Sequence, residues 1–264
     1  FNRLSSLMFA NSPVDIFAFA GREIFLKRDD LLHPAFSGNK ARKFGYFLDH
    51  EFIGITKVIG HGSPLANSLY SLSTLAKMKG WQCDFYVDHI ASLIVKHPTG
   101  NYAAALANGA NIIDLSELMA QKLAFTQSQG EPQVLLEINA RSEPALQTGS
   151  ARLSCQEYIE TQVLANEPTA LFIPEGGRCS YAEYGVNVLA QEIVQFAQAN
   201  DLVDLTVFLP SGTGTTALFL NQYFIRQQTA IRVVTCAVVG GDDFLRLQFS
   251  MLNPNTLEHP QIVN

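Results

Sequence analysis

The chain has 264 residues, of which 47% are hydrophobic and 16% are charged, and its formal net charge is −6. This composition is typical of a compact globular protein and excludes an intrinsically disordered one. The acidic balance, without a basic cluster interleaved with aromatic residues, argues against nucleic-acid binding. The longest apolar stretches are too short for a bilayer, so the sequence predicts no membrane span.

The cysteines and histidines give no sign of a metal site. The four cysteines are widely spaced, and none of the six histidines stands at a metal-ligand spacing from a cysteine or an acidic residue. We therefore expect reduced thiols and no metal. The first residues show no charged leader followed by an apolar block and a cleavage site. These features predict a cytoplasmic protein.

Strand-like segments recur along the chain and alternate with segments of helical spacing. The predicted strands are 23–27, 57–59, 83–87, 111–115, 133–137, 171–173, 205–209 and 232–239. The predicted helices are 40–48, 68–78, 101–108, 115–126, 153–164, 182–199 and 215–225. This alternation favours an α/β fold with mostly parallel sheets. Residues 127–133 and 139–150 are loop-like, and at the second of these we expect the chain to pass from one sheet to another.

Lys40 stands where a tight loop enters a helix. It follows Ser37, Gly38 and Asn39 and begins the helical segment 40–48, downstream of the first predicted strand. Most lysines are solvated surface charges. In a pocket, however, a lysine amine is a candidate for a Schiff base with a carbonyl cofactor. The local sequence alone leaves both interpretations open.

The loop after the strand at 57–59 contains His61, Ser63 and Asn67. Asn67 either caps the next helix or turns its amide toward a ligand. His61 and Ser63 are candidates for acid–base or hydrogen-bonding roles, although an isolated loop histidine is more often solvated.

A second loop, Pro174-Glu175-Gly176-Gly177, follows the strand at 171–173 and precedes a helix near Tyr181. It is either a tight connection or a turn whose backbone amides face a ligand. The sequence does not decide between the two.

The loop at 211–216 lies between the strand at 205–209 and a helix, and it combines two glycines with four hydroxyl side chains. Glycines let the backbone approach a ligand closely, and the amides at a helix start point toward an anion. Hydroxyl side chains add further donors. We therefore favour an anion site over a plain connector. Its residues are Ser211, Gly212, Thr213, Gly214, Thr215 and Thr216.

The same loop also fits a dinucleotide-binding pattern. Gly212, Gly214 and Ala217 match G-x-G-x-x-A, and Asp242, placed at the end of the next strand, would bind a ribose. The late position of the motif in the chain argues against this interpretation, because such a motif usually opens its domain.

Taken in order, these segments resemble a family of pyridoxal-phosphate (PLP) enzymes, the 1-aminocyclopropane-1-carboxylate deaminases and D-cysteine desulfhydrases. The segments Lys27-Arg28-Asp29-Asp30 and Phe36-Ser37-Gly38-Asn39-Lys40-Ala41-Arg42-Lys43 are similar to the family's K-R-E/D-D…G-G-N-K-x-R-K. The stretch from Pro174 to Gly185 resembles its P-x-G…G-x-x-G, and 211–216 looks like its phosphate loop.

The resemblance implies that Lys40 carries PLP, that Asn67 contacts the ring's phenolic oxygen, and that 211–216 hold the phosphate. It implies a tryptophan-synthase-β-like fold of two domains in three α/β/α layers, the larger built from 1–48 and 152–264 and the smaller from 49–151. It also implies a small amino-acid substrate and a homodimer. Ser63, Glu175 and Gly176 are the candidate substrate contacts.

The sequence departs from the family pattern in two places. Where the family reads Q-S-N, with a serine acting near the substrate, this chain has Leu65-Ala66-Asn67; Ser63 is the nearest upstream hydroxyl. The family's D-P-V-Y-x-G-K segment is not in the given sequence. Three functions remain open: a deaminase or lyase that releases ammonia and a 2-oxo acid, a catalytically impaired PLP-binding protein, and a dinucleotide-binding oxidoreductase.

Overall fold

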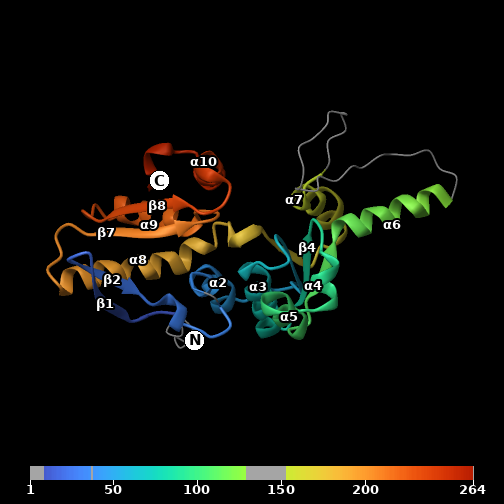
Figure 1. Cartoon of the computed structure of the whole chain (residues 1–264), viewed down its shortest axis with the longest axis horizontal. Coiled ribbons are helices and arrows are strands. Elements are labelled where there is room, and N and C mark those ends of the chain that lie inside the picture. Colours follow the sequence, from blue (N-terminus) through green and yellow to red (C-terminus); the bar gives the residue numbers. More distant parts are fainter. Residues whose placement is uncertain (1–8, 37, 129–152, 264) are drawn as a thin grey trace. The chain divides into compact units, whose positions relative to one another are not determined.

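The computed structural model describes residues 9–36, 38–128 and 153–263 (Figure 1). The chain divides into two units: unit 1 comprises Phe1–Phe52 and Gly176–Asn264, and unit 2 comprises Ile53–Glu175. Ser37, the predicted strand at 133–137 and the predicted loop at 139–150 lie outside the described residues. None of the described helices is long and apolar enough to cross a membrane.

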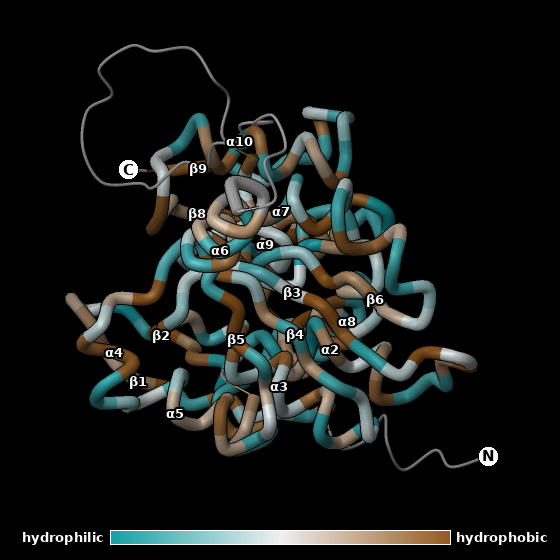
Figure 2. The backbone as a smooth tube through the Cα atoms, turned by 90° about the vertical axis from the view of Figure 1, so that its right-hand side faces the viewer, coloured by the Kyte–Doolittle hydropathy of each residue, from teal (hydrophilic) through white to brown (hydrophobic). Residues whose placement is uncertain are grey.

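Unit 2 is built on a parallel sheet of four strands in the order β5-β4-β3-β6. The strands are β3 (Lys57–His61), β4 (Gln82–Val87), β5 (Asn111–Asp114) and β6 (Ala170–Ile173), and β6 forms a continuous hydrophobic stretch (Figure 2). β3 lies between β4 and β6. From β3 the chain adds β4 and then β5 on one side of the sheet, and it later returns to add β6 on the other side. Loops at the carboxyl ends of neighbouring strands at such a reversal are where open α/β sheets bind ligands.

The helices of unit 2 follow the predicted segments closely, with one addition and one irregularity. The regular ones are α3 (Asn67–Lys79), α5 (Gly100–Ala107) and α6 (Leu115–Ser128), and the short α4 (Ser92–Lys96) was not predicted. The predicted helix at 153–164 is instead α7 (Cys155–Tyr158), a π-turn (Ile159–Val163) and a 3₁₀ turn (Leu164–Asn166). Ser154 and Glu157 form a capping box that starts α7.

Unit 1 begins with an antiparallel hairpin of β1 (Val14–Phe19) and β2 (Arg22–Lys27). β2 agrees with the predicted strand at 23–27, whereas β1, and with it the hairpin, was not predicted. Its two turn residues, Ala20 and Gly21, both have positive φ, 50° and 75°. This matches the twist of a two-residue hairpin turn, in which both central residues are left-handed.

The second sheet of unit 1 is parallel, in the order β7-β8-β9. Its strands are β7 (Thr206–Ser211), β8 (Arg232–Ala237) and β9 (Gln261–Ile262), and its helices are α8 (Ala182–Ala199), α9 (Thr215–Arg226) and α10 (Gly241–Leu252). The apolar residues of α8 recur at helical spacing and form a core with α9 and β8. The bounds of α8 agree with the prediction, because this spacing is unbroken over the whole helix.

The helix that carries Lys40, α2 (Lys40–Asp49), packs against α8 at very short range. A β-carbon built on Gly185 of α8 would lie 1.9 Å from the carbonyl oxygen of Arg42, so only glycine fits this contact. The two helices are further joined by Arg42, whose side chain is fully buried and ion-paired to Glu192 at 2.7 Å and to Asp29 at 2.9 Å. The lysine helix is thus fixed by packing and by charge.

The division into units differs from the predicted domains mainly at the second crossing of the chain. The prediction assigned residues from 152 onward to the larger domain, whereas unit 1 resumes only at Gly176. The reason is that β6 pairs with β3, which keeps the segment up to Ile173 within unit 2. The first crossing, after Phe52, lies four residues beyond the predicted 48.

Candidate cofactor site

Lys40 is the first residue of α2, and its side chain is half-buried. Gly38 has a φ of 47°, which turns the chain sharply just before the helix. The Nζ atom of Lys40 donates to Oδ1 of Asn39 at 3.1 Å. Burial lowers the pKa of Lys40 below its ordinary value, because a charged ammonium loses hydration there. A larger share of the amine is therefore neutral and nucleophilic than in a solvated lysine.

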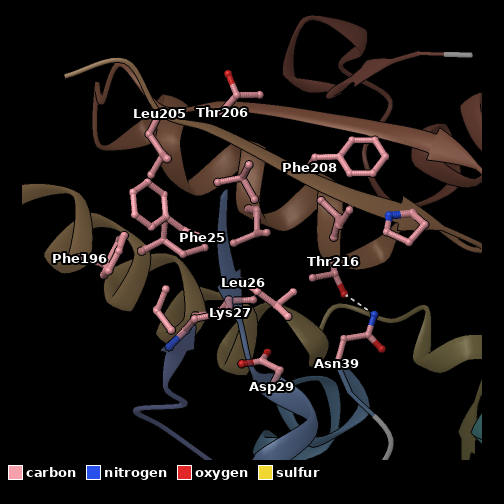
Figure 3. Close-up of a pocket in the computed structure, with 17 residues that line it drawn as sticks. Phe25, Leu26, Lys27, Asp29, Asn39, Phe196, Leu205, Thr206, Phe208 and Thr216 are labelled. Atoms are coloured by element: carbon pink, nitrogen blue, oxygen red, sulfur yellow. Dashed lines mark hydrogen bonds between the residues drawn. The ribbon is translucent and has the colours of Figure 1, made fainter. Parts of the chain in front are cut away.

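Asn39 connects this lysine to the glycine-rich loop. Its Nδ2 atom donates to Oγ1 of Thr216 at 3.1 Å, a contact drawn as a dashed line in Figure 3. The two residues are 177 positions apart in the chain, and both belong to unit 1. The amine and the predicted anion loop are therefore brought together in one unit. Asn39 is part of the lysine motif, but its role was not predicted because its partner lies far away in sequence.

The glycine-rich loop joins β7 to α9 at a left-handed glycine. Gly214 has a φ of 67° and stands at the N-cap of α9, where the described residues supply no side-chain cap. A β-carbon on Gly214 would lie 2.3 Å from Phe249 and 2.6 Å from Leu245, whereas one on Gly212 would meet no atom within 4 Å. The first-turn amides of a helix lack intrahelical partners and attract anions. This loop is therefore a suitable anion site.

The four hydroxyls of the loop all have protein partners. Ser211 lies within β7 rather than after it, and its Oγ accepts from Oγ1 of Thr235 at 2.7 Å. Thr213 and Thr215 share a hydrogen bond of 3.1 Å. Thr216 accepts from Asn39, and a hydroxyl that accepts one hydrogen bond still has its own proton to donate. Thr216 thus retains a proton for a further acceptor.

The turn at Gly176 and Gly177 lies against both the lysine helix and the glycine-rich loop. Both glycines have a φ of 70°. A β-carbon on Gly176 would approach Thr213 to 2.9 Å, and one on Gly177 would approach Phe44 to 3.1 Å. Within unit 1, Gly176 is therefore a neighbour of the anion loop. Lys43, which the sequence analysis did not single out, donates from Nζ to the carbonyl of Gly176 at 2.9 Å.

The remaining predicted residues lie in unit 2, at the carboxyl ends of β3 and β6. Ser63 and Asn67 are exposed; Oγ of Ser63 accepts from the amide of Leu65, and Oδ1 of Asn67 accepts from Asn101 at 2.8 Å. The N-cap of α3 is Ala66, so the interpretation of Asn67 as the cap is wrong. Asn67 is held by Asn101 instead, and its side chain lies at the start of the helix.

His61 and Glu175 are neighbours within unit 2. The backbone amide of Glu175 donates to Nε2 of His61 at 3.3 Å, and the ring of His61 is buried and stacked on Phe172. His61 is therefore not a solvated loop histidine. A β-carbon on Gly62 would lie 3.3 Å from Oε1 of Glu175. The loops after β3 and β6 are thus in contact with each other.

A cavity of about 380 Å³ lies within unit 1, and Lys27, Asn39 and Thr216 are among the residues that line it (Figure 3). Apolar side chains of the hairpin, α8 and β7 make up most of its lining, including Val14, Phe25 and Leu209. A phosphate needs donors and positive potential, which an apolar lining does not provide. The apolar part of this cavity therefore does not suit a phosphate, whereas the first-turn amides of α9 do.

The residues of unit 1 fit the needs of PLP. That cofactor requires an amine for its aldehyde and an anion site for its phosphate. Lys40 supplies a half-buried amine with a lowered pKa, and the open space at Gly212 lies beside the amides that start α9. No group of three or more metal-binding side chains occurs in the described part of the chain.

Comparison with known proteins decides the family. Residues 10–248 match the family model described as pyridoxal-phosphate dependent enzyme. The chain belongs to this family. The predicted family resemblance and the predicted PLP cofactor are thereby confirmed.

A D-cysteine desulfhydrase of Salmonella typhi is 26% identical over 200 residues, which are 75% of this chain and 52% of that protein. The chain thus spans about half the length of this curated relative. Among solved structures, an ACC deaminase homologue has a TM-score of 0.62 at 19% identity, covering 99% of this chain and 76% of its own. A hydrogen sulfide-producing enzyme of Fusobacterium nucleatum has a TM-score of 0.52 at 12% identity, covering 89% and 65%. These two likenesses confirm the predicted α/β fold.

The dinucleotide alternative is wrong. The match to the PLP family opposes it, and the structure also removes its acidic residue. Asp242 does not end a strand: β8 stops at Ala237, and Asp242 lies in the first turn of α10. The predicted strand ran on to 239, but Gly240 and Gly241 both have positive φ, 72° and 77°, which ends the extended chain and starts the helix.

Proposed function

We propose that this chain uses PLP to deaminate, or to eliminate from the β-carbon of, a small amino acid of the D-cysteine or 1-aminocyclopropane-1-carboxylate class. The products are ammonia and a 2-oxo acid. The observation that carries the proposal is the Asn39–Thr216 hydrogen bond, which ties the lysine helix to the glycine-rich loop. The family match and the names of the similar proteins support the reaction class.

Each part of the unit 1 site has a role in this proposal. Lys40 would hold the cofactor through its amine, and as a neutral amine it would move the proton of the substrate's α-carbon. The amides at the start of α9, with Thr216, bind the phosphate. When bound, PLP supplies an electron sink for the negative charge that develops on that α-carbon. The lowered pKa of Lys40 suits both tasks, because only the neutral amine attacks a carbonyl or accepts a proton.

A second candidate function is a PLP-binding protein with little turnover, and one observation favours it. At the start of α3, Ala66 is the N-cap and Leu65 is exposed at 55%. Neither side chain donates a hydrogen bond or carries a proton. Ser63 lies upstream, with its hydroxyl accepting from the amide of Leu65 at 3.3 Å. In this second proposal the cofactor attaches at Lys40, but the substrate lacks a serine partner.

The decisive experiment is the visible spectrum of the purified protein loaded with PLP, before and after borohydride reduction, followed by mapping of the labelled lysine. We expect a yellow protein whose label falls on Lys40 and is lost in Lys40→Ala. Lys96→Ala, at an exposed lysine of unit 2, serves as the matched control and keeps the label. A label on any other lysine refutes both proposals.

Turnover then separates the two candidates. D-cysteine and 1-aminocyclopropane-1-carboxylate are offered to the loaded protein, and ammonia and 2-oxo acid are measured. Release of both products that depends on Lys40 supports the enzyme. A correctly labelled protein that turns over neither compound supports the impaired alternative.

A further inference from the structure

Lys43 is a lysine buried without a carboxylate partner among its described hydrogen bonds and ion pairs. It is 3% exposed, and its Nζ donates to the backbone carbonyl of Gly176 at 2.9 Å. It lies one turn after Lys40 on α2, on the same side of the helix. Burying an amine costs free energy unless it forms a hydrogen bond. The hydrogen bond to Gly176 offsets this cost. An apolar side chain of similar length would fill the same space without the cost, so the hydrogen bond itself is what distinguishes a lysine here.

The carbonyl that Lys43 holds belongs to the turn that lies between α2 and the glycine-rich loop. On one side, Gly177 lies against the lysine helix. A β-carbon on Gly177 would lie 3.1 Å from the ring of Phe44 and 3.5 Å from Cδ of Lys43. On the other side, a β-carbon on Gly176 would approach Oγ1 and Cγ2 of Thr213 to 2.9 Å. The turn is thus in contact with the lysine helix and with the loop at once.

We propose that Lys43 is a positioning residue of the cofactor site: by holding the Gly176 carbonyl, it fixes the Gly176–Gly177 turn against Thr213 and so fixes the shape of the anion loop. The proposal rests on the proposed function in taking 211–216 as the phosphate site. It adds that the amine acts as a hydrogen-bond donor at a distance from the phosphate. Its charge is not required, because a neutral amine also donates.

The pKa of Lys43 agrees with this role. Burial lowers it well below its ordinary value, the neighbouring Lys40 lowers it further, and only Cys179 opposes the change. The titratable groups that act on Lys43 are thus one lysine and one thiol. A neutral amine at this position donates to a carbonyl without placing a second full charge beside Lys40.

The test compares four proteins: the wild type, Lys43→Met, Gly176→Ala and the double variant. Lys96→Met, the same substitution at an exposed lysine, is the matched control. Circular dichroism first establishes that each protein folds. Amide hydrogen exchange of residues 176–178 is then measured without cofactor, and the affinity for inorganic phosphate and for PLP is measured at low and high salt.

We expect Lys43→Met to speed exchange at 176–178 and to weaken phosphate binding by roughly fivefold, the usual effect of one lost hydrogen bond. Because Gly176→Ala disturbs the same turn, the double variant should lose less than the product of the two single losses. The loss should not depend on salt. Lys96→Met should match the wild type in every measurement.

Two results would overturn the proposal. Exchange and phosphate affinity equal to those of Lys96→Met would leave Lys43 with no positioning role. Losses that multiply in the double variant and vanish at high salt would mean that Lys43 acts on the anion by its charge. If Lys43→Met does not fold, Gly176→Ala decides alone, and an unchanged phosphate affinity there refutes the coupling of turn and loop. A wild type that fails to attach PLP at Lys40 refutes the proposed function, whereas the exchange measurement still tests Lys43.

Discussion

Gly185 of α8 lies so close to the backbone of Arg42 on α2 that a β-carbon there would be 1.9 Å from the carbonyl oxygen. We expect Gly185→Ala to force the two helices apart and to lower the free energy of unfolding by about 1–3 kcal/mol, the usual cost of overpacking. Because α2 begins at Lys40, PLP occupancy should fall as well. Urea unfolding and the visible spectrum measure the two effects.

Gly45, on α2 itself, is the matched control for this prediction. A β-carbon there would lie 3.9 Å from Tyr184, which is an ordinary contact. Gly45→Ala should be neutral or stabilise by about 0.5–1 kcal/mol, since alanine favours a helix interior. Equal destabilisation by both substitutions would contradict the role assigned to close packing at Gly185.

The buried ion pair of Arg42 and Glu192 should contribute clearly to the stability of unit 1. Arg42 keeps Asp29 as a partner when Glu192 is removed, and Glu192 keeps Lys27 when Arg42 is removed. Arg42→Met and Glu192→Gln should therefore each destabilise by about 1.5–3 kcal/mol, the usual worth of a hydrogen bond to a charged group. The exposed pair of Arg232 and Asp204 is the control, and Arg232→Met should cost about 0–1 kcal/mol. Denaturant unfolding compares them. Similar costs for the buried and exposed arginines would refute this expectation.

The two glycines of the anion loop should behave differently. Gly214→Ala collides with Phe249 and Leu245 and has a φ of 67°, so we expect lower stability together with loss of phosphate binding. Gly212→Ala meets no atom within 4 Å, so its stability should stay near that of the wild type. Its phosphate affinity should still fall, because the methyl group enters the open space. Unchanged phosphate binding in Gly212→Ala would move the anion away from this loop.

The buried amine of Lys43 should make stability depend on pH in a defined direction. Its folded pKa is lowered from the ordinary 10.5, so the unfolded chain binds more protons between the two values, and stability rises with pH. The stability of the wild type relative to Lys43→Met should therefore increase from pH 7 toward about pH 10. Chemical unfolding across this range measures it. A constant difference would show that Lys43 keeps its ordinary pKa, and a difference that falls with pH would show that its pKa is raised; either result contradicts the prediction.

If the second proposed function holds, restoring polar side chains at the start of α3 should raise turnover. The double substitution of Leu65→Gln and Ala66→Ser supplies the hydrogen-bonding groups that the resembling family carries there. We expect more 2-oxo acid per labelled Lys40, and an unchanged affinity for PLP. Ser63→Ala in the wild type shows whether that upstream hydroxyl supports any residual turnover.

Local spacing explains which parts of the fold were predictable. The apolar residues of α8 repeat without a break, and the glycine-rich segment between β7 and α9 has few alternatives to a strand–loop–helix. By contrast, β1 was missed because it is paired only with β2 and exposes most of its side chains, including Phe17 and Phe19. Five of its six residues are apolar, so polar and apolar side chains do not alternate and the segment shows no clear strand period.

The site was predictable as a set of loops and not as a set of contacts. Lys40 and the anion loop stand out because their residue types are unusual for surface connectors. The contacts that unite them join residues more than 100 positions apart, as between Lys43 and Gly176 or Asn39 and Thr216. Nothing in the local sequence of Asn39 names Thr216 as its partner. Such pairings depend on how α2 packs on α8.

The discontinuity of unit 1 has a consequence for how the protein folds during synthesis. α2 leaves the ribosome long before α8, since the whole of unit 2, Ile53–Glu175, is translated between them. Unit 2 is contiguous and therefore free to fold as it emerges, whereas Arg42 must wait for Glu192. Closing so long a loop slows assembly. Lys40 therefore becomes able to take up a cofactor only late, after the nascent chain has returned to its first helix.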